Sequence, residues 1–226
     1  MAFCFALATI FAMWPALTNG QPFFFPDTTA YVRGADLAIA RVVGERFATD
    51  WAKDERRTVE IKSAVEPSDR KAKPVQRPVL AGRSLIYGAL LYLGALTGRM
   101  WLAIFLQSVI AVYLTYLFVT RTLGLDFRCF LVACGLLCLA TSLPFYVSFL
   151  MPDVFAGFLI LGFSILATTW DALSHPERAA TIAILLFAVL AHATHVMVLA
   201  LLTALVAAYV LLLSRRCRPS VPDSLV

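Results

Sequence analysis

The feature that most constrains this chain is a series of long apolar runs. The longest covers residues 179–213, about 35 residues whose polar break is the pair His192 and His195, and another covers residues 101–119. About 20 apolar residues in a helix cross the hydrocarbon core of a bilayer, whereas the strands of a membrane barrel alternate apolar and polar positions. The runs therefore predict an all-α polytopic membrane protein.

Composition and charge exclude other classes of protein. Hydrophobic residues make up 61% of the 226 residues and charged residues 15%, with a mean hydropathy of +0.82, which leaves too little polar surface for a soluble protein. The net charge of +5 does not indicate a nucleic-acid partner, because the basic residues lie at the ends of apolar runs or among acidic residues in one long loop. The five cysteines have no Cys-x-x-Cys spacing, so neither a disulfide framework nor a zinc site is predicted.

We expect one membrane domain over residues 1–226 with about six transmembrane helices. Because about 35 residues would form a helix of about 50 Å, the longest run must break near His192. Pro144 is expected to kink the span that contains it. The predicted spans are 2–18, 100–120, 129–149, 154–170, 179–192 and 195–213; an outer loop covers 20–98, with interfacial amphipathic helices at 28–47 and 84–96, and a basic cytoplasmic tail covers 214–226.

The orientation of these spans follows from the short connections between them. The arginines in these connections are Arg121, Arg128 and Arg178. Short basic loops stay in the cytoplasm, and six crossings place all three arginines on that side. The long loop then faces outward, together with Asp27, Asp153 and the break at His192. A span at 84–96 in place of an interfacial helix would change this parity.

Two aspartates each follow a proline at the start of an apolar or amphipathic segment. Asp27 stands in Pro26-Asp27 and Asp153 in Pro152-Asp153. A carboxylate at membrane depth is costly, so each is a candidate for a functional site. An aspartate before a helix is also an ordinary N-cap, and for Asp27 both interpretations stay open. Asp153, with apolar runs on both sides, could instead bind a divalent cation, a proton or a cationic partner.

The two histidines at the break of the last run are three residues apart. On a helix, His192 and His195 would share one face. That spacing can serve a metal, but two histidines without a third ligand are weak evidence for zinc. One interpretation is a pair that hydrogen-bonds to the backbone at a helix break. The other is a role in binding phosphate or handling protons.

Tyr31 and Arg83 are further candidates in the predicted outer loop. Arg83 precedes the predicted interfacial helix and could contact lipid phosphates. Anchoring to lipid head groups predicts the same residue. Tyr31 fits an aromatic belt at the membrane surface as well as it fits a binding site.

The layout of these residues resembles that of integral-membrane glycosyltransferases of the GT-C fold. A first span is followed by residues 26–31 (PDTTAY), which open a large outer loop, and Asp153 and His192 come later on the same face. The class includes lipid A aminoarabinose transferases and protein O-mannosyltransferases. These enzymes carry acidic-acidic-x-x-Tyr in the first outer loop and a second acid near a later helix. They transfer sugars from polyprenyl-phosphate carriers on the non-cytoplasmic face.

The resemblance implies a role for each candidate residue. Asp27 would be the acid of the first loop and the general base, and Tyr31 the tyrosine that follows it. Asp153 would be the second acid and could hold a divalent cation at the carrier phosphate. The phosphate would lie near His192, His195 and Arg83, the last of these assigned from position alone.

The resemblance also implies a setting, and the chain departs from the family in two ways. The setting would be a bacterial inner membrane with a periplasmic active face and a lipid-borne donor. The first-loop motif has one acid where the family has two. The chain has about six expected spans where such enzymes have more, which is expected of a piece of a longer protein or of a minimal member.

Two other classes of protein fit the same pattern. In a small-solute or proton-coupled transporter, the acids and histidines would form a relay at the broken helix. The candidates gather at one face and no internal repeat is visible, which argues against this class. In a non-catalytic membrane assembly subunit, the aspartates would be helix caps and the histidines packing groups.

Overall fold

Helices form almost all of the regular structure in this computed structural model. The structure describes residues 1–44, 47–49, 84–97 and 100–216. Arg83, most of the predicted outer loop and the end of the predicted tail lie outside the described residues. Within the described ranges, pairing between extended segments is confined to one isolated bridge between Phe23 and Phe149. The prediction of an all-α protein is confirmed.

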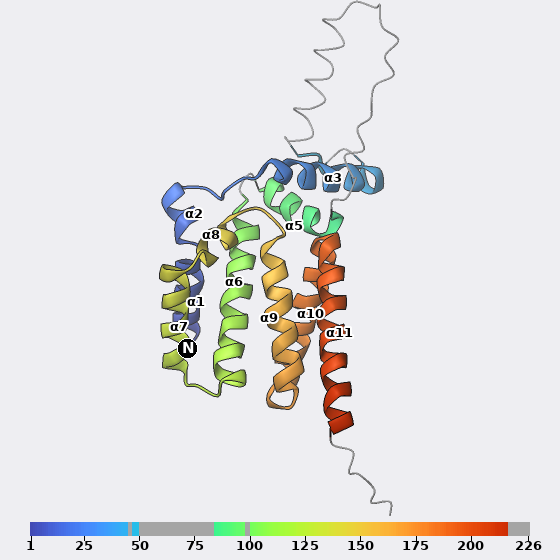
Figure 1. Ribbon diagram of the computed structural model, residues 1–226. Helices are drawn as coiled ribbons and strands as arrows, with labels where there is room; N and C mark the ends of the chain where they lie inside the picture. Colours follow the sequence, from blue (N-terminus) through green and yellow to red (C-terminus); the bar gives the residue numbers. More distant parts are fainter. Residues whose placement is uncertain (45–46, 50–83, 98–99, 217–226) are drawn as a thin grey trace, which may run out of the picture.

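The helices form an upright bundle with two helices lying across one end of it (Figure 1). The upright helices are α1 (Ala2–Ala12), α6 (Trp101–Leu117), α7 (Phe127–Ala140), α9 (Val154–Thr169), α10 (His175–Ala191) and α11 (Ala193–Arg216). The crossing helices are α3 (Pro26–Val43) and α5 (Leu85–Leu96), and two short helices, α2 (Trp14–Asn19) and α8 (Leu143–Ser148), lie near the same end. We call this the α3–α5 end.

Three of the described helical segments are long and apolar enough to cross a membrane. They are Trp101–Thr122, Val154–Ala172 and Ala193–Leu213. Two of them extend beyond a helix named above, the first by a π-helix, Phe118–Thr122, and the second by a 3-10 turn, Trp170–Ala172. These segments support an integral membrane protein. Their number is smaller than the six spans predicted from the sequence.

Prolines account for two of the missing spans. The predicted span 2–18 is divided at Met13, and Pro15 stands in the first turn of α2. The predicted span 129–149 ends at Ala140, and Pro144 stands in the first turn of α8. Proline lacks the N–H that a helix interior needs but is tolerated in a first turn. The expected kink at Pro144 is therefore a break, and α7 is about 21 Å long, less than the ~30 Å hydrocarbon core.

The predicted break in the longest apolar run is confirmed. Helix α10 ends at Ala191, and His192 adopts extended backbone angles before α11 begins. The amide of His195 then donates to the carbonyl of His192, which closes the first turn of α11.

The two predicted interfacial segments are α3 and α5, and both lie across the ends of the upright helices (Figure 1). They pack on each other closely. A Cβ added at Gly88 would lie 2.5 Å from the backbone oxygen of Tyr31. Real atoms do not approach so closely, so the crossing requires glycine at this position.

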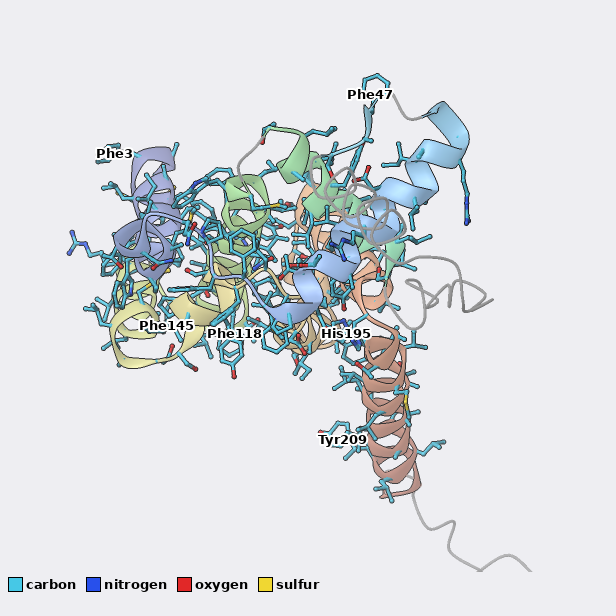
Figure 2. The ribbon with its side chains drawn as sticks, turned by 90° about the horizontal axis from the view of Figure 1, so that it is seen from above. Phe3, Phe47, Phe118, Phe145, His195 and Tyr209 are labelled. Carbon is cyan, nitrogen blue, oxygen red and sulfur yellow. The ribbon has the colours of Figure 1, made fainter. Side chains whose placement is uncertain are left out.

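Helix α6 occupies the centre of the bundle, whereas α11 lies at its edge. Helix α6 packs against α1, α5, α7, α8 and α9, and 61% of its apolar window is buried. The corresponding window of α11 is 0% buried. Figure 2 shows α11 leaning away from the other helices, with His195 where it meets them and Tyr209 on the part that diverges.

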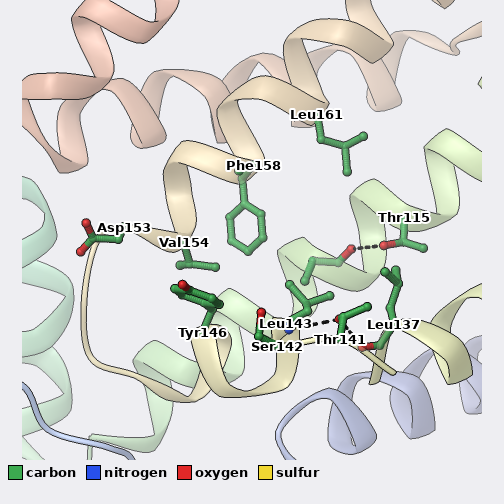
Figure 3. Close-up of a pocket in the computed structure, with 12 residues that line it drawn as sticks. Thr115, Leu137, Thr141, Ser142, Leu143, Tyr146, Asp153, Val154, Phe158 and Leu161 are labelled. Atoms are coloured by element: carbon green, nitrogen blue, oxygen red, sulfur yellow. Dashed lines mark hydrogen bonds between the residues drawn. The ribbon is translucent and has the colours of Figure 1, made fainter. Parts of the chain in front are cut away.

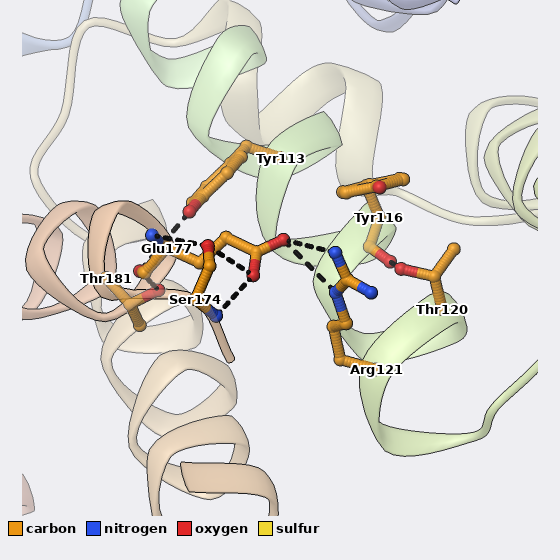
Figure 4. A network of polar contacts seen from close by, with 7 residues as sticks. All are labelled: Tyr113, Tyr116, Thr120, Arg121, Ser174, Glu177 and Thr181. Carbon is orange, nitrogen blue, oxygen red and sulfur yellow. Dashed lines mark hydrogen bonds and ion pairs between the residues drawn. The ribbon is translucent and has the colours of Figure 1, made fainter. Parts of the chain in front are cut away.

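The end of the bundle opposite α3 and α5 is joined by an ion pair (Figure 4). Arg121, in the π-helix that follows α6, donates from Nε and Nη2 to Oε1 of Glu177 in the first turn of α10. The other oxygen of this carboxylate accepts hydrogen bonds from the amide and hydroxyl of Ser174, the N-cap of α10. We call this group the Arg121–Glu177 clamp.

Candidate functional site

Two segments that lie far apart in the sequence are joined at the α3–α5 end. The amide of Phe23 donates to the carbonyl of Ser148 (2.9 Å), and the amide of Leu150 donates back to the carbonyl of Phe23 (2.9 Å). The buried hydroxyl of Thr28 donates to the carbonyl of Leu150 (3.0 Å). Thr28 directly follows Asp27, and Leu150 stands three residues before Asp153. These bonds bring the two Pro-Asp segments to the same end of the bundle, as the sequence predicted.

The two aspartates stand at the starts of α3 and α9. Asp27 is the second residue of α3 and half-buried, and the N-cap of that helix is Phe25, whose amide donates to the hydroxyl of Thr28. Asp153 occupies the N-cap position of α9 but makes no capping hydrogen bond, and its side chain is exposed. The N-cap interpretation therefore does not explain the carboxylate of Asp153.

A buried tyrosine and a buried glutamine connect the elements beneath these aspartates. Tyr87 of α5 packs edge-on against Tyr31 of α3 (5.3 Å between ring centroids) and against Phe155 of α9 (6.0 Å). Its hydroxyl donates to Oε1 of Gln107 in α6 (3.2 Å). The amide of Gln107 donates to the carbonyls of Val147 and Phe149, each at 3.0 Å. We call these contacts the Tyr87–Gln107 clamp.

The electrostatics of Tyr87 show that the Asp153 charge acts on this clamp. Burial raises the pKa of Tyr87 well above its usual value, and Tyr31 and the negative charge of Asp153 act in the same direction. Tyr87 therefore stays a neutral hydrogen-bond donor. Tyr31 itself is 2% exposed, so it lies in the packing between α3 and α5. Its predicted role in binding substrate stays a prediction.

The two histidines lie where α10 meets α11, at the α3–α5 end. Nδ1 of His195 lies 2.6 Å from the carbonyl oxygen of Ala188, so this nitrogen donates and the ring is fixed. Nδ1 of His192 accepts from the amide of Thr194 (3.3 Å). The ring centroids are 5.5 Å apart. The interpretation as a pair that hydrogen-bonds to the backbone at a helix break thus fits the Nδ1 atom of each histidine.

Two cavities meet at Asp153. The larger, about 470 Å³, lies between α6, α7, α8 and α9, and the smaller, about 270 Å³, extends to Phe25 at the start of α3. Both are lined by Tyr146, Asp153 and Val154. Figure 3 shows Asp153 at the edge of the larger cavity, with its carboxylate directed away from the apolar residues that line the rest. The cavities give the aspartate access to a ligand from two sides.

A metal site is not assembled by the residues that the structure describes. Among them, no group of three or more His, Cys, Asp or Glu side chains could hold a metal ion. Asp153 offers one carboxylate at its position, and a divalent cation prefers several oxygen ligands. Of the proposed site residues, Asp153 is the one assigned to the expected cation.

Sequence reasoning missed the Tyr87–Gln107 clamp. Gln107 is the signal that could have revealed it, because an amide in the middle of an apolar run must find partners inside the protein. Tyr87 carried no comparable signal, since its hydroxyl suits the membrane surface equally well.

Comparisons of the chain with models of known protein families, with curated proteins and with solved structures gave no match.

Proposed function

We propose that this protein is a membrane glycosyltransferase that moves a sugar from a polyprenyl-phosphate carrier to an acceptor on the non-cytoplasmic face. One observation carries the proposal: two segments more than 100 residues apart, each with a Pro-Asp pair, are hydrogen-bonded together at one end of a membrane bundle. A purely structural junction does not need an exposed carboxylate such as that of Asp153, which makes no capping hydrogen bond.

The reaction would divide between the aspartates and the histidines. Asp27 would act as general base, taking the proton from the acceptor group as it attacks the anomeric carbon of the sugar. The bond between that carbon and the carrier phosphate breaks, and the phosphate leaves with the bonding electrons. His192 and His195 stand at the N-terminus of α11, where the helix dipole favours an anion. Because Nδ1 of His192 accepts a hydrogen bond, its ring N–H is on Nε2 and can be donated to the phosphate.

The proposed role of a cation is separate from these steps. A divalent cation on Asp153 would neutralise the leaving phosphate. Because the described residues offer it one carboxylate, no step of the reaction is assigned to it. Chelation by EDTA during the transfer assay tests its participation.

The proposed location is the bacterial inner membrane with the site on the periplasmic face. Arg121 and Arg178 lie at the end opposite α3 and α5, and short basic connections favour the cytoplasm. A lipid-borne donor would enter sideways from the bilayer, beneath the crossing helices α3 and α5.

The proposal is tested by following radiolabelled sugar from polyprenyl-phosphate sugars into membrane lipid or protein, with purified protein in proteoliposomes. We expect Asp27→Asn to abolish transfer, a loss of at least 10²-fold for a general base, while the protein still inserts into the membrane. Asp171→Asn is the matched control, because Asp171 is exposed in the connection between α9 and α10 at the opposite end.

Each competing class predicts another result. Undiminished transfer by Asp27→Asn would remove this residue from the site. Solute flux through the pure protein, without sugar transfer, would identify a transporter. Stability and cellular activity retained after neutralising both Asp27 and Asp153 would identify an assembly subunit.

A further inference from the structure

The larger cavity is lined mostly by apolar residues, and Asp153 lies at its edge (Figure 3). Its apolar walls include Leu137 of α7 and Phe158 and Leu161 of α9. Thr141, Ser142, Tyr146 and Asp153 stand in the same lining. The volume of about 470 Å³ lies within the range of pockets that bind small ligands. Such a lining suits a ligand with a hydrocarbon tail and a polar head.

The charge of the lining selects among polar heads. Among the described residues of the lining, Asp153 is the one carboxylate, and none is a lysine, an arginine or a histidine. When no divalent cation is bound at Asp153, a phosphate beside it would meet a like charge that no described residue of these walls compensates, which is unfavourable. A hydroxyl or an amine would instead donate hydrogen bonds to the carboxylate, and an amine would add an opposite charge.

Gly157 gives this cavity an opening along α9. The residue is exposed and lines the cavity, and a Cβ added there would meet no atom within 4 Å. A glycine inside a helix costs up to about 1 kcal/mol relative to alanine. The missing side chain leaves room for a hydrocarbon chain to pass between α7 and α9 from the surrounding bilayer.

We propose that this cavity, the α7–α9 groove, binds the hydrocarbon chain of an amphiphile whose head presents a hydroxyl or an amine, and no phosphate, to Asp153. The smaller cavity continues from Asp153 toward Phe25 and so leads from the head group to the segment that carries Asp27. The amphiphile would then be the acceptor of the sugar, and this part of the inference rests on the proposed function. Binding of the chain does not depend on it.

Photolabelling of the protein in phosphatidylcholine nanodiscs tests the groove. The probes are three 16-carbon amphiphiles with a diazirine in the chain: a primary amine, a primary alcohol and a monophosphate. Mass spectrometry then locates the labelled residues. We expect the amine and the alcohol to label Leu137 and Phe158 above the level of Leu205 on the exposed α11, and the monophosphate to label the groove about tenfold less.

Two glycine substitutions separate a filled groove from a damaged protein. A Cβ at position 157 meets no atom within 4 Å, so Gly157→Leu should place its side chain in the groove and abolish groove labelling while α11 labelling persists. Gly135→Leu is the matched control, because Gly135 of α7 also has open space around it but does not line the groove. Asp153→Asn should narrow the difference between amine and monophosphate, since it removes the charge that distinguishes them.

Three outcomes would overturn the inference. They are equal labelling of the groove and of α11, strongest groove labelling by the monophosphate, and unchanged labelling in Gly157→Leu. Groove labelling without sugar transfer would keep the groove and reject the enzyme. Sugar transfer without groove labelling would keep the enzyme and reject the groove.

Discussion

The two ends of the bundle are held together in different ways. At the α3–α5 end, the buried residues Gln107 and Thr28 bond to backbone carbonyls far away in the sequence. At the opposite end, the Arg121–Glu177 clamp joins two helices near the surface, with side chains 39% and 15% exposed. Water can replace the partners of an exposed group but not those of a buried one. The end that carries the aspartates is therefore the one whose contacts are costly to lose.

The largest effect is expected at the centre of the α3–α5 end. Gln107→Leu leaves the hydroxyl of Tyr87 and the carbonyls of Val147 and Phe149 without this partner, at roughly 1–3 kcal/mol for each buried group. The free energy of unfolding in bicelles measures the loss. A cycle with Tyr87→Phe should show that the two effects are not additive; simple additivity would argue that the clamp does not act as a unit.

The next effect is expected where α3 crosses α5. Gly88→Ala places a Cβ 2.5 Å from the carbonyl oxygen of Tyr31, and relieving the overlap should cost roughly 1–3 kcal/mol. Gly135→Ala is the control, since its Cβ meets nothing within 4 Å. This control should gain up to about 1 kcal/mol from helix propensity. Equal melting temperatures for the two variants would contradict the close crossing.

A smaller effect is expected at the junction of the two Pro-Asp segments. Thr28→Val keeps the shape of the side chain but removes the hydrogen bonds to the carbonyl of Leu150 and from the amide of Phe25. We expect a loss of about 1–2 kcal/mol. Thr203→Val on the exposed face of α11, where the hydroxyl bonds only within its own helix, should change little. Comparable losses of stability in both variants would show that the hydrogen bonds of Thr28 stabilise the fold no more than a bond within one helix.

The smallest effect is expected at the opposite end. Arg121→Gln should cost about 0.2–1 kcal/mol, as is usual for an exposed ion pair. Partial burial raises the pKa of Glu177, but hydrogen bonds from Ser174 and Arg121 outweigh it and hold the pKa below its usual value.

The lowered pKa of Glu177 gives this end a defined pH dependence. A carboxylate with a lowered folded pKa stabilises the protein above its unfolded value and loses this contribution as the pH falls through the folded value. Melting curves of wild type and Glu177→Gln should therefore converge at acid pH. If the difference between the two melting temperatures instead grew as the pH fell, the pKa of Glu177 would be raised in the folded protein and not lowered.

Several features of the fold were predictable because they depend on local chemistry. The break at His192 follows from a run too long for a bilayer, and α3 and α5 follow from short or amphipathic apolar patterns between polar segments. The division of the first and third predicted spans was missed, although Pro15 and Pro144 were visible. Whether a proline kinks a helix or begins a new one depends on where the next turn packs.

The sequence by itself determined a helical membrane protein and named Asp27, Asp153, His192 and His195 as residues that an apolar setting does not explain. Only the tertiary structure decided that Phe23 pairs with Phe149, that Gln107 supports this junction, and that a groove runs from Asp153 between α7 and α9. The physical reason is the range of the forces. Hydropathy and helix breaks act within one segment, whereas cavities and buried hydrogen bonds exist only after distant segments have packed together.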